Sequence, residues 1–384
     1  MAATTQEILY PTQSELLSSE RISSMVAGID RENIAFGILY FPEKKMWKMI
    51  ACTMDEMIPI HNPIDLKAFS SESGFVAFPF NPVMTTGYYI PNHLTVVELS
   101  EYRHKESASK DSKKSLKETR SEHYQEAVQR TVDAIKENSF SKIVLSRRSE
   151  FVFNDDQISP FVSWLIQEYP EANISIFNIP GEGLWISASP EILLSFSPTE
   201  GVRSMALAGT RTFEPGFDEI SLWSSKELEE QGIVTDFIRE VFQEQGIRKL
   251  KEKGPYSVQA GNLIHLRTDF NACDGTSDDF YDLVNSLHPT TAVCGTPRLE
   301  AKSWIKNNED FDRSFYSGFS GIVEPQLRKL VVNLRVANIT AGMITLYAGA
   351  GITKASVPEK EWIETSEKLK TLGNFLTQGF EKST

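Results

Sequence analysis

Two pairs of glutamates in the C-terminal half have a spacing that would let their carboxylates bind a divalent cation. Glu227 and Glu230 stand three residues apart, as do Glu361 and Glu364, and both pairs lie in stretches with a helical pattern. Residues at this spacing share one face of a helix, and carboxylate oxygens are the ligands that Mg²⁺ prefers. Solvated surface helices carry such pairs as well, so by spacing alone either interpretation stands.

A glycine-rich turn precedes the second glutamate pair. Gly349 and Gly351 alternate with small residues and lead into the helix that starts near Glu359. Positions without a side chain let a ligand or another element approach the backbone closely. A turn of this kind at the start of a helix also suits a carboxylate or phosphate.

Lys142 and Glu191 are candidates for proton transfer, because each borders an apolar β-like run. A lysine that faces inward is desolvated, which favours the neutral amine and therefore a base. A carboxyl against apolar walls keeps its proton longer, as a general acid must. Either residue could instead sit at a strand edge and face water.

Two further polar residues stand in apolar surroundings. His265 lies between Ile264 and Leu266, where a hydrogen-bonded core histidine is the default interpretation. Arg335 lies inside a β-like run predicted over 329–337, and a guanidinium buried there needs an acceptor. A substrate carboxylate, bound through two parallel hydrogen bonds, would serve.

The elements that must position these residues are mixed. Residues 1–102 form a β-rich part with short strands, residues 103–120 read as a polar, locally basic linker, and residues 121–384 alternate strands with helices. The strands are predicted at 34–41, 46–53, 74–80, 94–99, 142–146, 174–178, 184–188, 192–196, 329–337 and 343–348. The helices are predicted from 122 onward, at about 218–245, at 278–286 and at 359–379.

Composition excludes several classes of protein. The chain has 384 residues and a formal net charge of −13, which is a poor match to a phosphate backbone and argues against nucleic-acid binding. Three distant cysteines form neither a disulfide framework nor a metal cluster. No apolar run is long enough for a membrane helix, and the N-terminus lacks the pattern of a secretory signal. We expect a cytoplasmic protein.

Together these segments resemble the chorismate-utilising enzymes and, within them, the isochorismate synthases. The resemblance covers about residues 120–380. It rests on ten collinear segments: FSKIVLSR, SASPEILL, LAGTR, SKELEEQGIV, HL, LHPTTAVCGTP, FYSGFSGIV, LRVA, YAGAGI and EWIETSEKL. It implies a fold of mixed α/β class, with large antiparallel β-sheets in a sandwich-like core flanked by helices. It also favours a monomer without a glutaminase subunit.

The resemblance implies a role for each candidate residue. Mg²⁺ would be held by Glu230 and Glu364, with Glu227 and Glu361 close by through water. Lys142 would activate the water that attacks C2 of chorismate, and Glu191 would protonate the departing C4 hydroxyl. The residues implied to bind substrate are Gly209, Thr210, His265, Ala292, Tyr316, Arg335, Gly349, Gly351 and Lys368.

A few positions discriminate among relatives. Amine-transferring members carry a glutamine where Lys142 stands, so this lysine indicates water as the nucleophile. Salicylate synthases keep the lysine and then eliminate pyruvate; they remain an alternative, although the apolar Ala292 resembles enzymes that stop at isochorismate. A non-catalytic chorismate-binding regulator is a third hypothesis. These motifs do not separate menaquinone from siderophore synthesis.

The chain departs from the family pattern at one place. Gln231 and Gly232 follow Glu230, where the usual motif has a histidine directly after the metal-binding glutamate. Because glycine inside a helix costs roughly 1 kcal/mol relative to alanine, we expect a locally irregular helix and a looser metal site.

Overall fold

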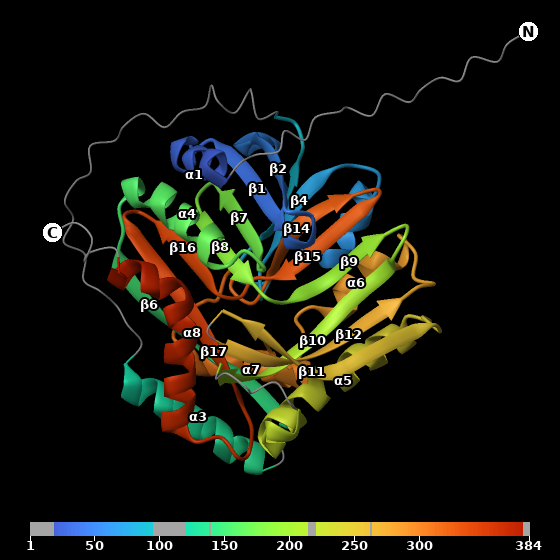
Figure 1. Ribbon diagram of the computed structural model, residues 1–384, viewed down its shortest axis with the longest axis vertical. Coiled ribbons are helices and arrows are strands. Elements are labelled where there is room, and N and C mark those ends of the chain that lie inside the picture. Colours follow the sequence, from blue (N-terminus) through green and yellow to red (C-terminus); the bar gives the residue numbers. More distant parts are fainter. Residues whose placement is uncertain (1–18, 95–119, 138–139, 214–219, 262, 379–384) are drawn as a thin grey trace, which may run out of the picture.

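Two large antiparallel sheets lie against each other in the computed structural model, which describes residues 19–94, 120–137, 140–213, 220–261 and 263–378 (Figure 1). The first sheet has eight strands in the order β13 (Gly295–Thr296), β6 (Lys142–Val152), β17 (Met343–Ile352), β16 (Val336–Thr340), β8 (Gly183–Ser189), β7 (Asn173–Ile179), β1 (Ile34–Phe41) and β2 (Met46–Thr53). The second has nine, in the order β11 (Leu250–Ala260), β12 (Leu263–Ala272), β10 (Gly201–Thr212), β9 (Ile192–Ser197), β15 (Leu327–Val332), β14 (Phe319–Glu324), β4 (Gly74–Phe78), β5 (Gly87–Pro91) and β3 (Ile58–Ile60). Each sheet therefore combines N-terminal and C-terminal strands.

An aromatic core fills the space between the sheets. Phe75, Phe177, Trp185 and Phe315 are fully or almost fully buried there, and their rings contact one another. Both sheets thus bury their inner faces, which explains why strands such as β1 and β4 are buried along their whole length.

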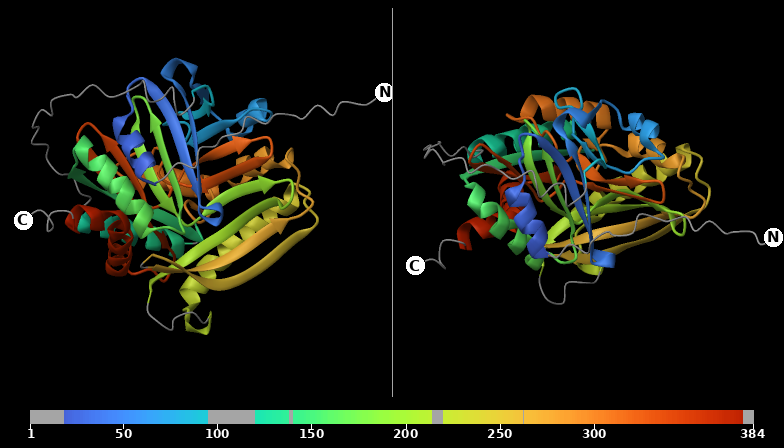
Figure 2. Two further views of the ribbon diagram at one scale, coloured as in Figure 1. Left: turned by 45° about the horizontal axis from the view of Figure 1, so that its top comes forward. Right: turned by 90° about the horizontal axis from the view of Figure 1, so that it is seen from above.

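Helices cover the outer faces of both sheets (Figure 2). On the first sheet these are α1 (Ser19–Gly28), α4 (Ile158–Glu168) and α8 (Pro358–Gln378); on the second, α5 (Ser225–Glu244) and α6 (Asp279–Leu287). The helices α3 (Ser121–Lys136) and α7 (Arg298–Asn308) pack around β6 and β17. The helix α3 was predicted from 122 onward, and its buried face runs from Tyr124 to Ile135.

The predicted fold class is confirmed, and most predicted strands are present, several of them longer than expected. The predictions over 95–99 and 103–119 lie outside the described residues. The strands that were not predicted are β3, β5, β10, β11, β12, β13 and β14. None of the helices in the described ranges is long and apolar enough to cross a membrane.

The largest error concerns the strand predicted over 329–337. The chain forms β15 up to Val332, leaves the second sheet, and enters the first sheet as β16 at Val336. Arg335 lies in this crossover with a φ of 47°. A crossover between two buried strands has the same apolar composition as one long strand, so sequence periodicity cannot separate the two.

Candidate active site

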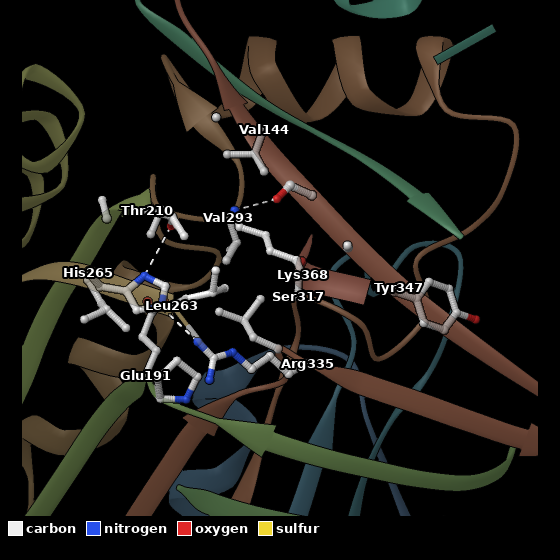
Figure 3. A pocket seen from close by; sticks show the side chains of 18 of the residues that line it. Val144, Glu191, Thr210, Leu263, His265, Val293, Ser317, Arg335, Tyr347 and Lys368 are labelled. Carbon is white, nitrogen blue, oxygen red and sulfur yellow. Dashed lines mark hydrogen bonds between the residues drawn. The ribbon is translucent and has the colours of Figure 1, made fainter. Parts of the chain in front are cut away.

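A cavity with an empty volume of about 750 Å³, solvent at its mouth included, opens where the two sheets meet α5 and α8 (Figure 3). Strands β6 and β17 contribute one wall, β10 and β12 another, and the Arg335 crossover a third. Ten of the predicted site residues line it: Glu191, Thr210, Glu230, His265, Ala292, Tyr316, Arg335, Gly349, Gly351 and Lys368. Residues separated by up to 177 positions in the chain are thus brought to one cavity, since Glu191 and Lys368 both line it.

The crossover aims the Arg335 side chain into the cavity. Its Nη2 donates a hydrogen bond of 2.8 Å to Nε2 of His265, and the two side chains point toward each other in Figure 3. Burial lowers the pKa of Arg335 to about 10, so the guanidinium remains charged at neutral pH. A buried cation whose hydrogen-bond partner is a neutral ring suits an incoming carboxylate.

His265 is a neutral relay between Arg335 and Thr210. Burial, followed by Arg335 and Lys368, lowers the pKa of His265 well below its usual value. Since Nε2 accepts from Arg335, Nδ1 carries the proton and donates to Oγ1 of Thr210 at 3.2 Å. The ring is satisfied on both sides, as the default interpretation expected, but it also lines the cavity.

A bulge in β10 presents Thr210 to this relay. The register between β10 and β12 shifts between Ala208 and Thr210, and Gly209 there has a φ of 62°, a conformation that favours glycine. Gly209 itself does not line the cavity. Its contribution is the backbone turn that directs Thr210.

Lys142 is completely buried at the start of β6, and its Nζ lies 3.0 Å from Oε1 of Glu230. The approach depends on Gly351, where a Cβ atom would clash with both side chains. Burial would raise the pKa of Glu230, but Lys142, with Lys226 and Lys368, holds it below its usual value. The inward orientation predicted for Lys142 is therefore present, although the lysine faces a carboxylate rather than only apolar walls.

Glu191 is a buried carboxyl beside the cavity. Glu191 is 2% exposed and lines the cavity. Burial raises the pKa of its carboxyl to about 8, although the positive charge of Lys142 acts to lower it. A carboxyl with such a pKa still carries its proton at neutral pH, which is the state that a general acid requires.

Of the glutamates expected to hold a metal, Glu230 lines the cavity, whereas Glu227, Glu361 and Glu364 are not among its lining residues. Glu361 pairs with Lys226 at 2.7 Å and Glu364 with Lys368 at 2.8 Å. Burial and the nearby Glu364 raise the pKa of Glu361. Within the described residues, no three acidic, histidine or cysteine side chains are close enough to form a ready-made metal site.

The donor set nevertheless fits a hard divalent cation. Oε2 of Glu361 is buried and has no hydrogen-bond partner within the described part of the chain. A buried carboxylate oxygen without a partner is costly. Glu361 and Glu364 also repel each other. A cation between them would therefore reduce this repulsion and also give the buried oxygen of Glu361 a partner.

Glu227 plays a different part from the other three glutamates. Its carboxylate accepts hydrogen bonds from the backbone N–H and the hydroxyl of Ser224, forming a capping box at the start of α5. Glu227 is therefore occupied with the helix end, a use that the spacing of glutamates alone does not reveal.

Gln231 and Gly232 leave α5 regular. The helix runs unbroken from Ser225 to Glu244, so the irregularity expected at Gly232 is absent. The amide of Gln231 is buried, accepts from the N–H of Ala208 at 2.9 Å and donates to Oγ1 of Thr268 at 3.0 Å. It thus ties α5 to β10 and β12 beside the bulge.

Sequence reasoning missed some residues of the site. Lys226 lies within the segment SKELEEQGIV but was assigned no role, because its partner Glu361 is 135 positions away in the chain. The apolar walls formed by Val144, Leu263 and Leu334 had no signal beyond ordinary core hydrophobicity.

Comparisons with known proteins agree with this geometry. A family model described as "Chorismate binding enzyme" matches residues 88–377. The vibriobactin-specific isochorismate synthase of Vibrio cholerae is 26% identical over 310 residues, covering 78% of each chain. The isochorismate synthase EntC of Escherichia coli is 28% identical over 316 residues, covering 78% of this chain and 79% of EntC.

Solved structures extend the likeness to the fold. DhbC from Bacillus anthracis, described as a 2,3-dihydroxybenzoate-specific isochorismate synthase, superposes with a TM-score of 0.74 at 25% identity and covers 93% of this chain and 99% of DhbC. The menaquinone-specific isochorismate synthase MenF from Escherichia coli shares the fold, with a TM-score of 0.75 at 19% identity, covering 91% of this chain and 90% of MenF.

Proposed function

Because this chain belongs to the family of chorismate-binding enzymes, we propose that it is an isochorismate synthase, an isomerase that converts chorismate into isochorismate. One observation supports this activity most directly: Glu191, a buried carboxyl with a raised pKa, lines the cavity, and the buried Lys142 lies directly behind two other lining residues, Glu230 and Gly351. The reaction needs one group that takes a proton from water and another that gives a proton to a hydroxyl.

The reaction moves a hydroxyl group across the substrate ring. Lys142 takes a proton from the water that attacks C2, the ring double bond shifts, and Glu191 donates its proton to the hydroxyl that leaves C4 as water. One water enters and one leaves, so the product is an isomer of the substrate. Since hydroxide is a poor leaving group, proton donation by Glu191 should contribute on the order of 10²-fold or more.

Two cations of the chain receive the charges of the dianionic substrate. Arg335 is buried and reaches the cavity from the crossover, and Lys368 reaches it from α8, where its Nζ also donates to the carbonyl of Gly349 at 2.9 Å. We assign the enolpyruvyl carboxylate to Arg335, with Tyr316 and the backbone at Gly349 and Gly351 beside it. His265 and Thr210 hold the guanidinium in place.

The metal is assigned to the other end of the cavity. Glu230 and Glu364 would hold Mg²⁺, with Glu361 and Glu227 near it, directly or through water. When bound, the metal neutralises and orients the ring carboxylate of the substrate. The partnerless oxygen of Glu361 and its repulsion by Glu364 support this assignment.

We further assign the enzyme to the cytoplasm, as a monomer without a glutaminase subunit. The three cysteines are free thiols, which suits a reducing compartment. Lys142 at the base position supports water rather than ammonia as the nucleophile, so the reaction has no need of an ammonia-supplying partner.

The test is a direct assay. The protein is incubated with chorismate and Mg²⁺, and the products are separated by chromatography while pyruvate is measured in a coupled assay. Isochorismate without pyruvate is the expected result. Salicylate accompanied by stoichiometric pyruvate would indicate the salicylate synthase alternative, and unchanged chorismate would overturn the proposal.

A further inference from the structure

Lys226 is a cation that pairs with Glu361, one of the glutamates expected near the metal. It lies in the first turn of α5, and its Nζ is 2.7 Å from Oε1 of Glu361. The side chain of Glu361 is 1% exposed, whereas that of Lys226 is 24% exposed. Lys226 therefore remains partly solvated, whereas the carboxylate of Glu361 with which it pairs is buried.

The charge of Lys226 acts on the whole carboxylate cluster. Burial works to lower the pKa of Lys226, but Glu361, Glu364 and Glu230 together raise it above its usual value. Lys142 and Lys368 pair with Glu230 and Glu364, so each of the three carboxylates has a lysine partner. A divalent cation that binds these carboxylates would therefore compete with the lysines for them.

Of the three lysines, Lys226 is the one that can leave at least cost. Lys142 is fully buried. Lys368 also donates to the carbonyl of Gly349. Lys226 is partly exposed and is held by Glu361, and a positive charge in the first turn of a helix opposes the helix dipole. Once its carboxylate partner is taken by another cation, little holds Lys226 in place.

We propose that Lys226 is a resident counter-ion of this cluster, which competes with Mg²⁺ for Glu361 and is displaced when the metal binds. The inference rests on the metal assignment made under Proposed function and adds a role for a residue outside the predicted set. The lysine keeps the carboxylates together in the metal-free protein, and in doing so it weakens metal binding. Removing it should therefore strengthen binding of Mg²⁺.

The test is a calorimetric titration of the full chain with MgCl₂ in the absence of chorismate. Lys226→Met should lower the Kd for Mg²⁺ by about tenfold, the scale of a typical coupling between two competing events. Lys226→Arg keeps the charge and should bind Mg²⁺ no more tightly than the parent chain. Lys370→Met is the matched control, because Lys370 forms an exposed ion pair with Glu367 on α8; its Kd should not change.

The sign of the effect separates this role from a merely structural one. A lysine that only positions Glu361 would, when removed, leave metal affinity equal or weaker, and that result overturns the proposal. Should Lys226→Met fail to fold, judged by circular dichroism, Lys226→Gln replaces it with the same expectation. Absence of Mg²⁺ binding in the parent chain and in both neutral variants also overturns it.

The chromatographic assay keeps this inference distinct from the proposed activity. If Lys226→Met binds Mg²⁺ more tightly but the parent chain forms no isochorismate, the counter-ion role of Lys226 stands and the proposed function is refuted. If isochorismate forms but metal affinity is unchanged in Lys226→Met, the proposed function stands and the counter-ion role of Lys226 is refuted.

Discussion

Two clusters of buried charge adjoin strand β6, and they differ in how completely their hydrogen bonds are satisfied. Glu309 and Arg313 form a closed cluster: both side chains are 2% exposed, and every polar atom of both has a partner. Glu230, Glu361 and Glu364 form an open cluster, with one lysine each and one oxygen of Glu361 left without a partner.

The closed cluster completes the edge of a sheet. Strand β13 pairs with β6 only at Lys142 and Ile143. Farther along the same edge, Arg313 donates to the carbonyl of Val144 at 2.7 Å and Glu309 accepts from the N–H of Ser146 at 2.7 Å. These two side chains take the place of a neighbouring strand by binding the backbone of β6. Their charges therefore stabilise the sheet edge.

The open cluster retains binding capacity. Its glutamates come from α5 and α8, and two of its charged residues, Glu230 and Lys368, line the cavity. The comparison teaches that burial of charge alone does not mark a functional site. The incomplete set of partners is the informative feature.

Among changes at the open cluster, Lys142→Ala should have the largest effect on turnover. Loss of the base should reduce turnover on the order of 10³-fold, within the range usual for general base catalysis. Steady-state rates of isochorismate formation measure this, with thermal unfolding as the control for folding. A folded variant that retains full activity would remove Lys142 from the role of base.

Arg313→Met should produce the largest effect on the closed side. The change leaves Glu309 buried without its partner, which should lower the free energy of unfolding by about 4 kcal/mol. Urea denaturation measures the loss. Arg239→Met is the control, because its ion pair with Glu252 is about one third exposed, and it should cost less than about 1 kcal/mol. Equal losses in both variants would refute the stabilising role of the closed cluster.

The pH dependence of turnover should report the proton on Glu191. Since burial raises its pKa to about 8 in the substrate-free protein and the protonated form is the active one, kcat/KM should fall through loss of this acid as pH rises above about 8. Below that pH the acid form predominates and no such loss occurs. In Glu191→Gln the residual activity should lack this alkaline decline; an unchanged decline would assign it to another group.

Glu227→Ala should have the smallest effect. The change removes the capping box of α5 and should lower the free energy of unfolding by about 1 kcal/mol. Ser224→Ala removes the partner of the same cap and should match it in urea denaturation. A Glu227 variant with unchanged stability and much weaker Mg²⁺ binding would place this carboxylate with the open cluster instead.

Much of the site was accessible from residue types and order. Lys142, Glu191 and the glutamate pairs were selected because each combined a reactive group with an apolar or helical context. The crossover at Arg335 was not accessible, because a chain that passes from one buried strand to another shows no break in its apolar pattern. The bulge at Gly209 was likewise hidden, since its register depends on β12, where the partner of Thr210 is 55 residues away.

The sequence by itself determined the chemical inventory of this protein: an amine and a carboxyl beside apolar runs, paired glutamates at helical spacing, and segments in the order of one enzyme family. Only the tertiary structure decided how these groups are used. It assigned Glu227 to a helix end, joined Lys226 to Glu361, and left one carboxylate oxygen without a partner. The physical reason is that charge state and hydrogen-bond satisfaction depend on neighbours and burial, which the folded chain brings together from positions far apart in the sequence.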